Sequence, residues 1–230
     1  MMGYRIFLKR PLPSICSSNS GFAHGFGIST LRNLLGRYGP LGFIRLSIDY
    51  IYTLIRFPGA RLVRRPIYIR GRNHISIGSN FTCGVGLRLD AFPEQFNKNK
   101  ICLEIGNDVE VNDYVHIAVV QSVKIGNHVL IGSKVFISDH THGRYKSDAQ
   151  SNPEQPPALR FLDAVPVVIE DNVWIGESVC ILPGVTIGRG AVIGALSVIN
   201  KDIPPHSIAV GSPAVVIRAY SRESEKWEPT

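Results

Sequence analysis

Cysteine is scarce in this sequence and shows none of the spacings typical of metal sites. The four residues, Cys16, Cys83, Cys102 and Cys180, lie far apart, and no C-x-x-C motif occurs. This pattern argues against a structural zinc ion and against a disulfide framework. We therefore expect reduced thiols in a cytoplasmic protein that holds no metal.

Long apolar runs are also missing. The best candidate, residues 41–57, is interrupted by Arg45, Asp49 and Arg56, which a membrane-spanning helix would not readily accept. The first thirty residues lack the continuous apolar segment of a signal peptide. We expect residues 41–57 to form a helix that ends at Pro58-Gly59 and either covers one end of the fold or lies on a membrane surface.

Acidic residues are nearly absent from the first part of the chain. Residues 1–72 contain twelve Lys and Arg and a single acid, Asp49, which gives a net charge of +11, whereas residues 73–230 carry a net charge of −4. A basic end of this kind favours an anionic partner such as lipid headgroups at the inner face of the cell membrane, or a lipid-linked glycan phosphate. Nucleic acid is not expected, because basic and aromatic residues do not alternate as they do in nucleic-acid modules.

What the sequence does contain is a repeat with a period of six. Aliphatic residues recur at this step in three stretches, and small or β-branched residues follow four places later in each unit. The first positions are Ile105, Val111 and Ile117; then Ile125, Ile131 and Ile137; then Ile169, Ile175, Ile181, Ile187, Ile193 and Ile199. A period of six fits neither a helix nor a long alternating strand, but it fits short strands joined by tight corners, with three hexads in each coil. The pattern therefore predicts an all-β solenoid.

This repeat resembles the hexapeptide-repeat acyltransferases, over residues 66–218. The resemblance implies a left-handed parallel β-helix, with residues 1–65 as a basic, partly helical segment before it and residues 219–230 as a tail. It also implies a homotrimer, because active sites in this family lie between neighbouring subunits.

The repeat is broken twice, and such breaks usually mark functional positions. The step from Ile117 to Ile125 is eight residues, and the step from Ile137 to Ile169 is 32, so a long loop occupies residues 138–165. The loop begins with Asp-His-Thr-His-Gly at residues 139–143. If Thr141 fills the inward position of its hexad, both histidines point away from the core.

The loop sequence is similar to the catalytic region of galactoside, maltose and lipopolysaccharide O-antigen acetyltransferases. The resemblance implies transfer of an acetyl group from acetyl-CoA to a sugar hydroxyl, with His140 as general base and His142 as the alternative. A neutral imidazole suits proton removal near pH 7. Asp139 would orient a histidine or bind substrate hydroxyls.

The resemblance also implies binding residues elsewhere on the coils. The candidates for contact with the sugar acceptor are His116, Trp174 and Tyr145. The candidates for contact with acetyl-CoA are Gly176, Glu177, Ala195, Ser197, Asn200, Lys201 and Arg218. The backbone N–H near Gly176 and Glu177 would face the developing oxyanion.

Other functions remain open at this point. His116, His128, His140 and His142 allow a zinc enzyme resembling the γ-class carbonic anhydrases, although the His-Gly-Cys run of that class is absent. An N-acetyltransferase that acts on an amino sugar and a catalytically inert binding scaffold are the further alternatives.

Overall fold

The structure, a computed structural model, describes residues 28–93, 101–146 and 148–230. The chain divides into two compact units, residues 1–43 and 44–230, which we describe separately. The smaller unit contributes the first part of helix α1 (Ile28–Arg56), which is interrupted where Gly39 adopts a left-handed φ of 68° and Pro40 follows. The predicted helix at residues 41–57 is confirmed, and helical structure begins earlier than expected. No helix among the described residues is long and apolar enough to cross a membrane.

The larger unit is built from short strands that form three sheets, one along each side of the solenoid. The nine-stranded sheet has the order β1 (Leu62–Val63), β4 (Thr82–Cys83), β7 (Glu110–Val111), β10 (Leu130–Ile131), β15 (Trp174–Ile175), β18 (Val192–Ile193), β20 (Ser207–Gly211), β21 (Ala214–Ser221) and β22 (Lys226–Pro229). The six-stranded sheet has the order β19 (Val198–Ile199), β16 (Cys180–Ile181), β11 (Phe136–Ser138), β8 (His116–Val119), β5 (Leu87–Ala91) and β2 (Ile67–Arg70). The five-stranded sheet has the order β17 (Thr186–Ile187), β14 (Val167–Ile169), β9 (Val123–Ile125), β6 (Leu103–Ile105) and β3 (Ile75–Ile77).

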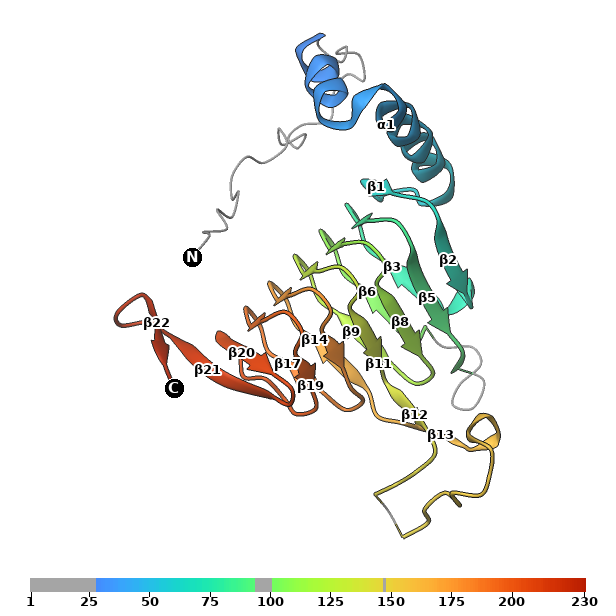
Figure 1. The fold of residues 1–230 in the computed structure, drawn as a ribbon, viewed down its shortest axis with the longest axis vertical. Helices are drawn as coiled ribbons and strands as arrows, with labels where there is room; N and C mark the ends of the chain where they lie inside the picture. Colours follow the sequence, from blue (N-terminus) through green and yellow to red (C-terminus); the bar gives the residue numbers. More distant parts are fainter. Residues whose placement is uncertain (1–27, 94–100, 147) are drawn as a thin grey trace. The chain divides into compact units, whose positions relative to one another are not determined.

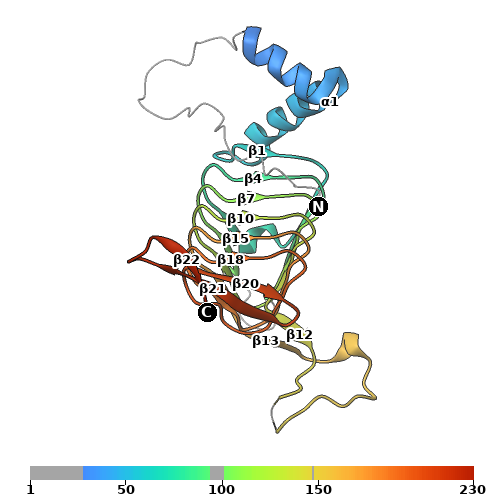
Figure 2. The ribbon, with the colours of Figure 1, turned by 60° about the vertical axis from the view of Figure 1, so that its left-hand side comes forward.

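The chain visits these sheets in turn, so that each strand pairs in parallel with the strand one coil further on (Figures 1 and 2). The hexad register predicted from the sequence is the register of the core. Ile131 aligns with Ile175 in the nine-stranded sheet, and Ile137 aligns with Ile181 in the six-stranded sheet. All six isoleucines from Ile169 to Ile199 are at most 1% exposed. The predicted parallel β-solenoid is confirmed, and its left-handed sense stays a prediction.

The glycines at the second hexad position allow the coils to stack closely. A Cβ added to Gly176 would lie 2.6 Å from the backbone nitrogen of Ala195 on the next coil. The left-handed corner positions are instead occupied by residues such as His128 and Asn172, with φ of 56° and 60°. The second-position glycines therefore relieve contact between coils, whereas Gly184 and Gly190 themselves occupy left-handed corner positions, with φ of 83° and 67°.

Both ends of the solenoid differ from the predicted boundaries. The first coil begins at β1 rather than at residue 66, because Leu62 and Val63 already pair with Thr82 and Cys83. At the other end, residues 219–230 are not a tail. They lie in β21 and β22, which add to the last coil as antiparallel strands and so protect its edge.

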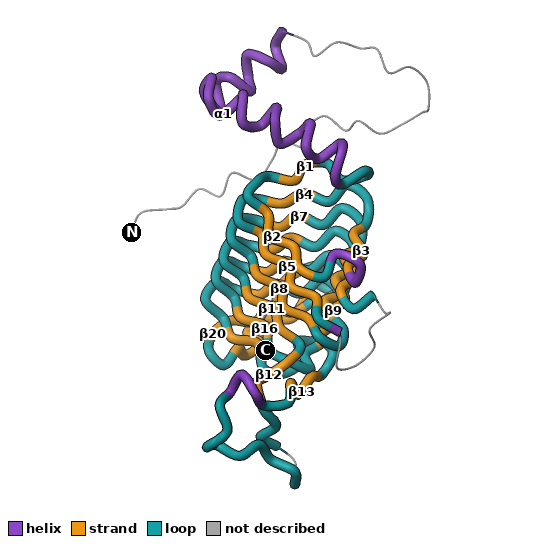
Figure 3. The backbone as a smooth tube through the Cα atoms, turned by 90° about the vertical axis from the view of Figure 1, so that its right-hand side faces the viewer, coloured by secondary structure: helices purple, strands orange, loops and turns teal. Residues whose placement is uncertain are grey.

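The long loop leaves the solenoid through a short antiparallel ribbon. Strands β12 (His140–His142) and β13 (Leu162–Ala164) pair with each other, and the 3₁₀ turn η3 (Pro157–Leu159) lies between them in sequence (Figure 3). A second 3₁₀ turn, η1 (Arg72–His74), connects β2 to β3. The expectation that Thr141 faces the core is wrong: Thr141 is exposed, because the chain has left the coil two residues after Ile137.

Candidate active site

The two breaks in the repeat meet at one corner of the solenoid. Strands β8 and β11 are neighbours, so the two extra residues that follow β8 lie beside the start of the long loop after β11. Asp139, the first loop residue, is 0% exposed. Its carboxylate accepts hydrogen bonds from the backbone N–H groups of Val120, Gln121 and Ser122, at 3.0, 2.7 and 2.8 Å. The extra residues after β8 thus supply three N–H donors, and the long loop after β11 supplies the carboxylate of Asp139 that accepts them.

Asp139 also holds the side chain of His140. Its Oδ1 atom lies 2.9 Å from Nδ1 of His140, whose side chain is 14% exposed. A carboxylate can only accept here, so Nδ1 carries the proton and Nε2 keeps its lone pair in the neutral ring. The Oγ atom of Ser138 lies 3.3 Å from the same Nδ1 atom. In this arrangement Nε2 is the nitrogen of His140 that can accept a proton.

His142 lies near His140 but differs from it in its surroundings. Its ring centroid is 6.3 Å from that of His140, and the residue is exposed on β12. The Tyr145 hydroxyl donates to the His142 carbonyl and accepts a hydrogen bond from Arg160 at 2.9 Å. Tyr145 therefore links the backbone of β12 to Arg160 near the other end of the loop, and its contact with an acceptor stays a prediction.

A charged cluster lies on the same sheet as β11. His116 Nε2 is 3.0 Å from the buried Asp90 carboxylate, which also accepts two hydrogen bonds of 2.7 Å from Arg70 and one of 2.7 Å from Arg88. Burial by itself raises the pKa of Asp90, but the hydrogen bonds from Arg70, His116 and Arg88 outweigh it and lower the pKa to about 2. Asp90 is therefore ionised near pH 7 and holds three basic side chains in place.

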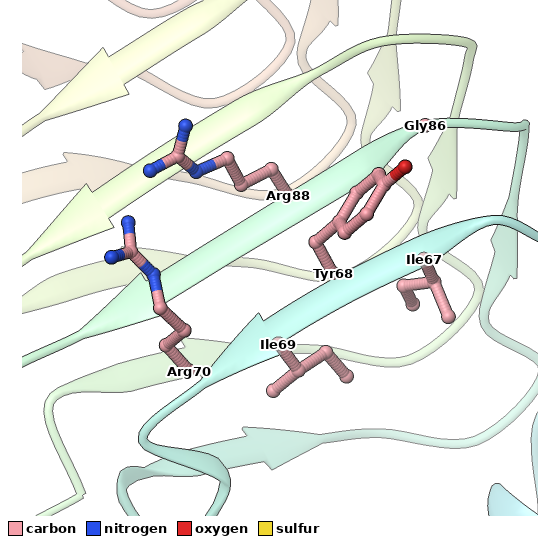
Figure 4. Close-up of a pocket in the computed structure, with 6 residues that line it drawn as sticks. All are labelled: Ile67, Tyr68, Ile69, Arg70, Gly86 and Arg88. Atoms are coloured by element: carbon pink, nitrogen blue, oxygen red, sulfur yellow. The ribbon is translucent and has the colours of Figure 1, made fainter.

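Arg70 and Arg88 border a cavity of about 610 Å³ that is also lined by Ile67, Tyr68, Ile69 and Gly86. Figure 4 shows the two guanidinium groups side by side on one side of the sheet. The register across β2, β5, β8 and β11 aligns Arg70 with Asp90, Ala118 and Ser138. Three strand spacings make this separation roughly 14 Å. The cavity and His140 therefore lie along one outer face of the six-stranded sheet.

Other predicted site residues lie on a different sheet. Trp174 is 49% exposed on β15 of the nine-stranded sheet, and Gly176 and Glu177 follow it at the next corner. His140 follows β11 of the six-stranded sheet. Within one chain the structure does not bring Trp174 or Glu177 together with His140.

The predicted acetyl-CoA residues divide into exposed and buried side chains. Ala195, Asn200 and Lys201 are exposed, as is Arg218, whose guanidinium donates to the Trp227 carbonyl at 3.0 Å. The prediction is wrong for the side chain of Ser197, which is 0% exposed. Its hydroxyl donates to Gly194 O at 2.7 Å and accepts from Gly211 N at 3.0 Å, so it fills the small inward position of its hexad and joins the last coil to β20.

Sequence reasoning missed Arg70, Arg88 and Asp90. The available signal was the alternation of charged residues two places apart in Arg88 and Asp90, within otherwise apolar strands. Only the pairing of β2 with β5 shows that Arg70 joins them.

The four histidines considered for a metal do not form a cluster. His116 faces Asp90, His128 lies 3.8 Å from Asp108 at a corner, and His140 faces Asp139. Across residues 28–93, 101–146 and 148–230, no group of three or more His, Cys, Asp or Glu could hold a metal ion within one chain.

Comparison with known proteins agrees with this architecture. The family model for the bacterial transferase hexapeptide, with six repeats, matches residues 166–201. Over 196 residues, 85% of this chain and 97% of the relative, the sequence is 47% identical to the putative lipopolysaccharide biosynthesis O-acetyl transferase WbbJ of Escherichia coli K12.

Solved structures show the same fold. A hexapeptide-repeat-containing acetyltransferase from Vibrio cholerae aligns with 84% of this chain and 92% of its own, with 26% identity and a TM-score of 0.52. AntD, an N-acyltransferase from Bacillus cereus, aligns with 71% of this chain and 81% of its own, with 22% identity and a TM-score of 0.57. From the repeat, the fold and the relative matched over nearly its whole length, we conclude that this chain belongs to the hexapeptide-repeat acetyltransferases.

Proposed function

We propose that the protein transfers an acetyl group from acetyl-CoA to a hydroxyl of a sugar, in the synthesis of a surface polysaccharide or lipopolysaccharide. The observation that carries this proposal is the pair of Asp139 and His140, with Nδ1 held at 2.9 Å and Nε2 left to take a proton. The 47% identical relative, named for lipopolysaccharide O-acetylation, supports the same substrate class. The use of acetyl-CoA agrees with the cytoplasm as the site of the reaction.

His140 acts as general base in this mechanism. Nε2 removes the hydroxyl proton while the sugar oxygen attacks the thioester carbonyl carbon. The tetrahedral species then collapses, the carbon–sulfur bond breaks, and protonated His140 returns its proton to the CoA thiolate. The Asp139 carboxylate stabilises the imidazolium through Nδ1, as in other histidine–carboxylate pairs. No covalent acyl-enzyme is needed.

The complete site requires a second subunit. Trp174 lies on β15 of the nine-stranded sheet and is proposed to face the acceptor, and Glu177, whose backbone N–H is proposed to face the oxyanion, lies at the corner after β15. His140 instead follows β11 of the six-stranded sheet. The corner at Glu177 and the corner at His140 stay apart within one solenoid, but two such corners can meet where the solenoids of adjacent subunits pack together. This geometry supports the homotrimer expected for the family, with acetyl-CoA bound between subunits along Ala195, Asn200 and Lys201 and reached by Arg218.

The acceptor lies along the outer face of the six-stranded sheet. His116 and the cavity beside Arg70 and Arg88 lie on this face, on strands that neighbour β11 and lead away from the corner at His140. Asp90 offsets only one of the two guanidinium charges, so the cavity favours an acceptor that carries a phosphate or another acidic group.

Incubation with labelled acetyl-CoA and a panel of nucleotide-linked and lipid-linked sugars tests the proposal. We expect label in the sugar as an ester that mild base removes. Label in an amide would instead indicate an N-acyltransferase like AntD, whose fold is similar to that of this chain. Absence of transfer to every acceptor, together with absence of acetyl-CoA binding, would contradict both enzyme functions and favour an inert scaffold.

A further inference from the structure

The part of α1 that belongs to the solenoid unit, residues 44–56, has its polar side buried. Asp49 is 2% exposed and Thr53 is 0% exposed. The Thr53 hydroxyl donates to the Asp49 carbonyl at 2.7 Å and accepts from the backbone N–H of Val63 on β1 at 2.8 Å. Asp49 also accepts a hydrogen bond of 2.8 Å from Arg65. These contacts fix which side of the helix faces the first coil.

The opposite side of the helix exposes four isoleucines. Ile44, Ile48, Ile51 and Ile55 are 54, 48, 57 and 73% exposed. Their spacing of four, three and four residues places them on one line along the helix. An ordinary surface helix shows the reverse arrangement, with its apolar stripe toward the core. We call these four residues the isoleucine stripe; a continuous exposed stripe of this kind marks an interaction surface, whereas single exposed apolar residues do not.

The helix and the coil that follows it are basic. Residues 44–72 contain seven arginines and a single acid. Arg61, Arg65 and Arg70 form ion pairs with Glu110, Asp49 and Asp90, which leaves Arg45, Arg56, Arg64 and Arg72 outside the ion pairs of the described residues. That acid, Asp49, is buried and paired with Arg65. A second copy of this chain would bring the same positive charge to the stripe and be repelled. Anionic lipid headgroups would be attracted, while the bilayer interior would accept the isoleucines.

We propose that the isoleucine stripe binds the surface of an anionic membrane, with its isoleucines inserted among the acyl chains near the headgroups and the surrounding arginines at the lipid phosphates. The helix therefore has two roles: its polar side covers the first coil, and its apolar side attaches the solenoid to the membrane. The stripe needs neither a spanning helix nor the acetyltransferase activity, so this proposal stands apart from the proposed function.

Co-sedimentation of the full chain with lipid vesicles tests the proposal. We expect the protein to bind vesicles that contain phosphatidylglycerol, and to bind pure phosphatidylcholine vesicles at least tenfold more weakly. The variant Ile48→Asn/Ile51→Asn should weaken binding to the anionic vesicles at least tenfold. Leu196→Asn, at a corner position that is 75% exposed, is the matched control and should bind like the wild type.

A second variant keeps the test valid if the isoleucine variant fails to fold, which circular dichroism would show. Arg56→Gln/Arg64→Gln leaves the stripe intact and should weaken binding several-fold at low salt, with a smaller effect at high salt. The proposal is overturned if the wild type does not bind anionic vesicles, or if the folded stripe variant binds as well as the control. It is also overturned if the stripe variant changes only the oligomeric state, because the stripe would then contact a second copy.

Discussion

The Asp139 carboxylate lies 2.9 Å from Nδ1 of His140 and is held by three backbone N–H groups from the neighbouring coil. This pairing favours His140 over His142 as the proposed base, because His142 lies exposed on the ribbon instead. In the same proposal Asp139 orients the base.

We expect His140→Ala to lower acetyl transfer by about 10²-fold or more, because no other group would remove the hydroxyl proton. The affinity for CoA, measured by calorimetry, should stay within a few-fold of the wild type. His142→Ala is the matched control and should keep most of the activity. The opposite ranking of these two variants would move the role of base to His142.

Replacement of Asp139 by Asn should lower kcat on the order of 10²-fold while the KM for acetyl-CoA changes little. The amide removes the charge that favours the imidazolium and can present an N–H group to the amides of residues 120–122. Some loss of stability is expected for the same reason, so activity is compared per mole of folded protein. A variant with normal kcat and only a lower melting temperature would show that Asp139 is purely structural.

The Asp90 cluster should stabilise the fold down to acidic pH. Its pKa of about 2 in the folded state lies below that of an unfolded aspartate, so the stabilisation is complete above about pH 4 and is lost as the pH falls toward 2. The shift corresponds to at most about 2 kcal/mol, because Arg70 and Arg88 are about half exposed and solvent screens their charges. Urea unfolding of the wild type and of Asp90→Asn should therefore differ most near neutral pH, and the difference should shrink on acidification. A difference independent of pH would contradict this account.

Arg88→Gln should raise the KM for an acidic acceptor about tenfold and leave kcat nearly unchanged, because Arg88 lies on β5, two strands from β11, the strand that precedes His140. A neutral acceptor should show little change. Lys226→Gln, on the exposed β22 strand, controls for the loss of one positive charge. An equal rise in KM for acidic and neutral acceptors would show that the cavity does not bind the acidic group of the acceptor.

Sedimentation should give a particle three times the 25.3 kDa of one chain. We expect a trimer because Trp174 and Glu177 lie at a different corner of the solenoid from His140. The proposed site needs both corners, so they must come from neighbouring subunits. A monomer with full acetyltransferase activity would show that a single chain builds the whole site.

Two errors of the sequence-based prediction occur where the chain leaves the repeat. Thr141 was placed at an inward position by extension of the six-residue step, but the ribbon of β12 and β13 begins at that point. The strands in residues 219–230 were missed because they pair with β20 and with each other, outside the hexad pattern. Ser197, inside the repeat, was assigned to acetyl-CoA from the family resemblance, although its position in the hexad already predicted an inward side chain.

The sequence by itself determined the solenoid, because each hexad buries its isoleucine in the same way and the period can be read from neighbouring residues alone. It also located the candidate active corner, since both interruptions of the repeat are visible in the spacing. Only the tertiary structure decided what these residues do. Asp139 meets the amides of residues 120–122 because coils stack, Arg70 meets Asp90 because β2 pairs with β5, and the isoleucine stripe faces outward because Thr53 bonds to β1. Each of these contacts joins residues from different coils or elements, and a local pattern carries no information about which distant partner a side chain will meet.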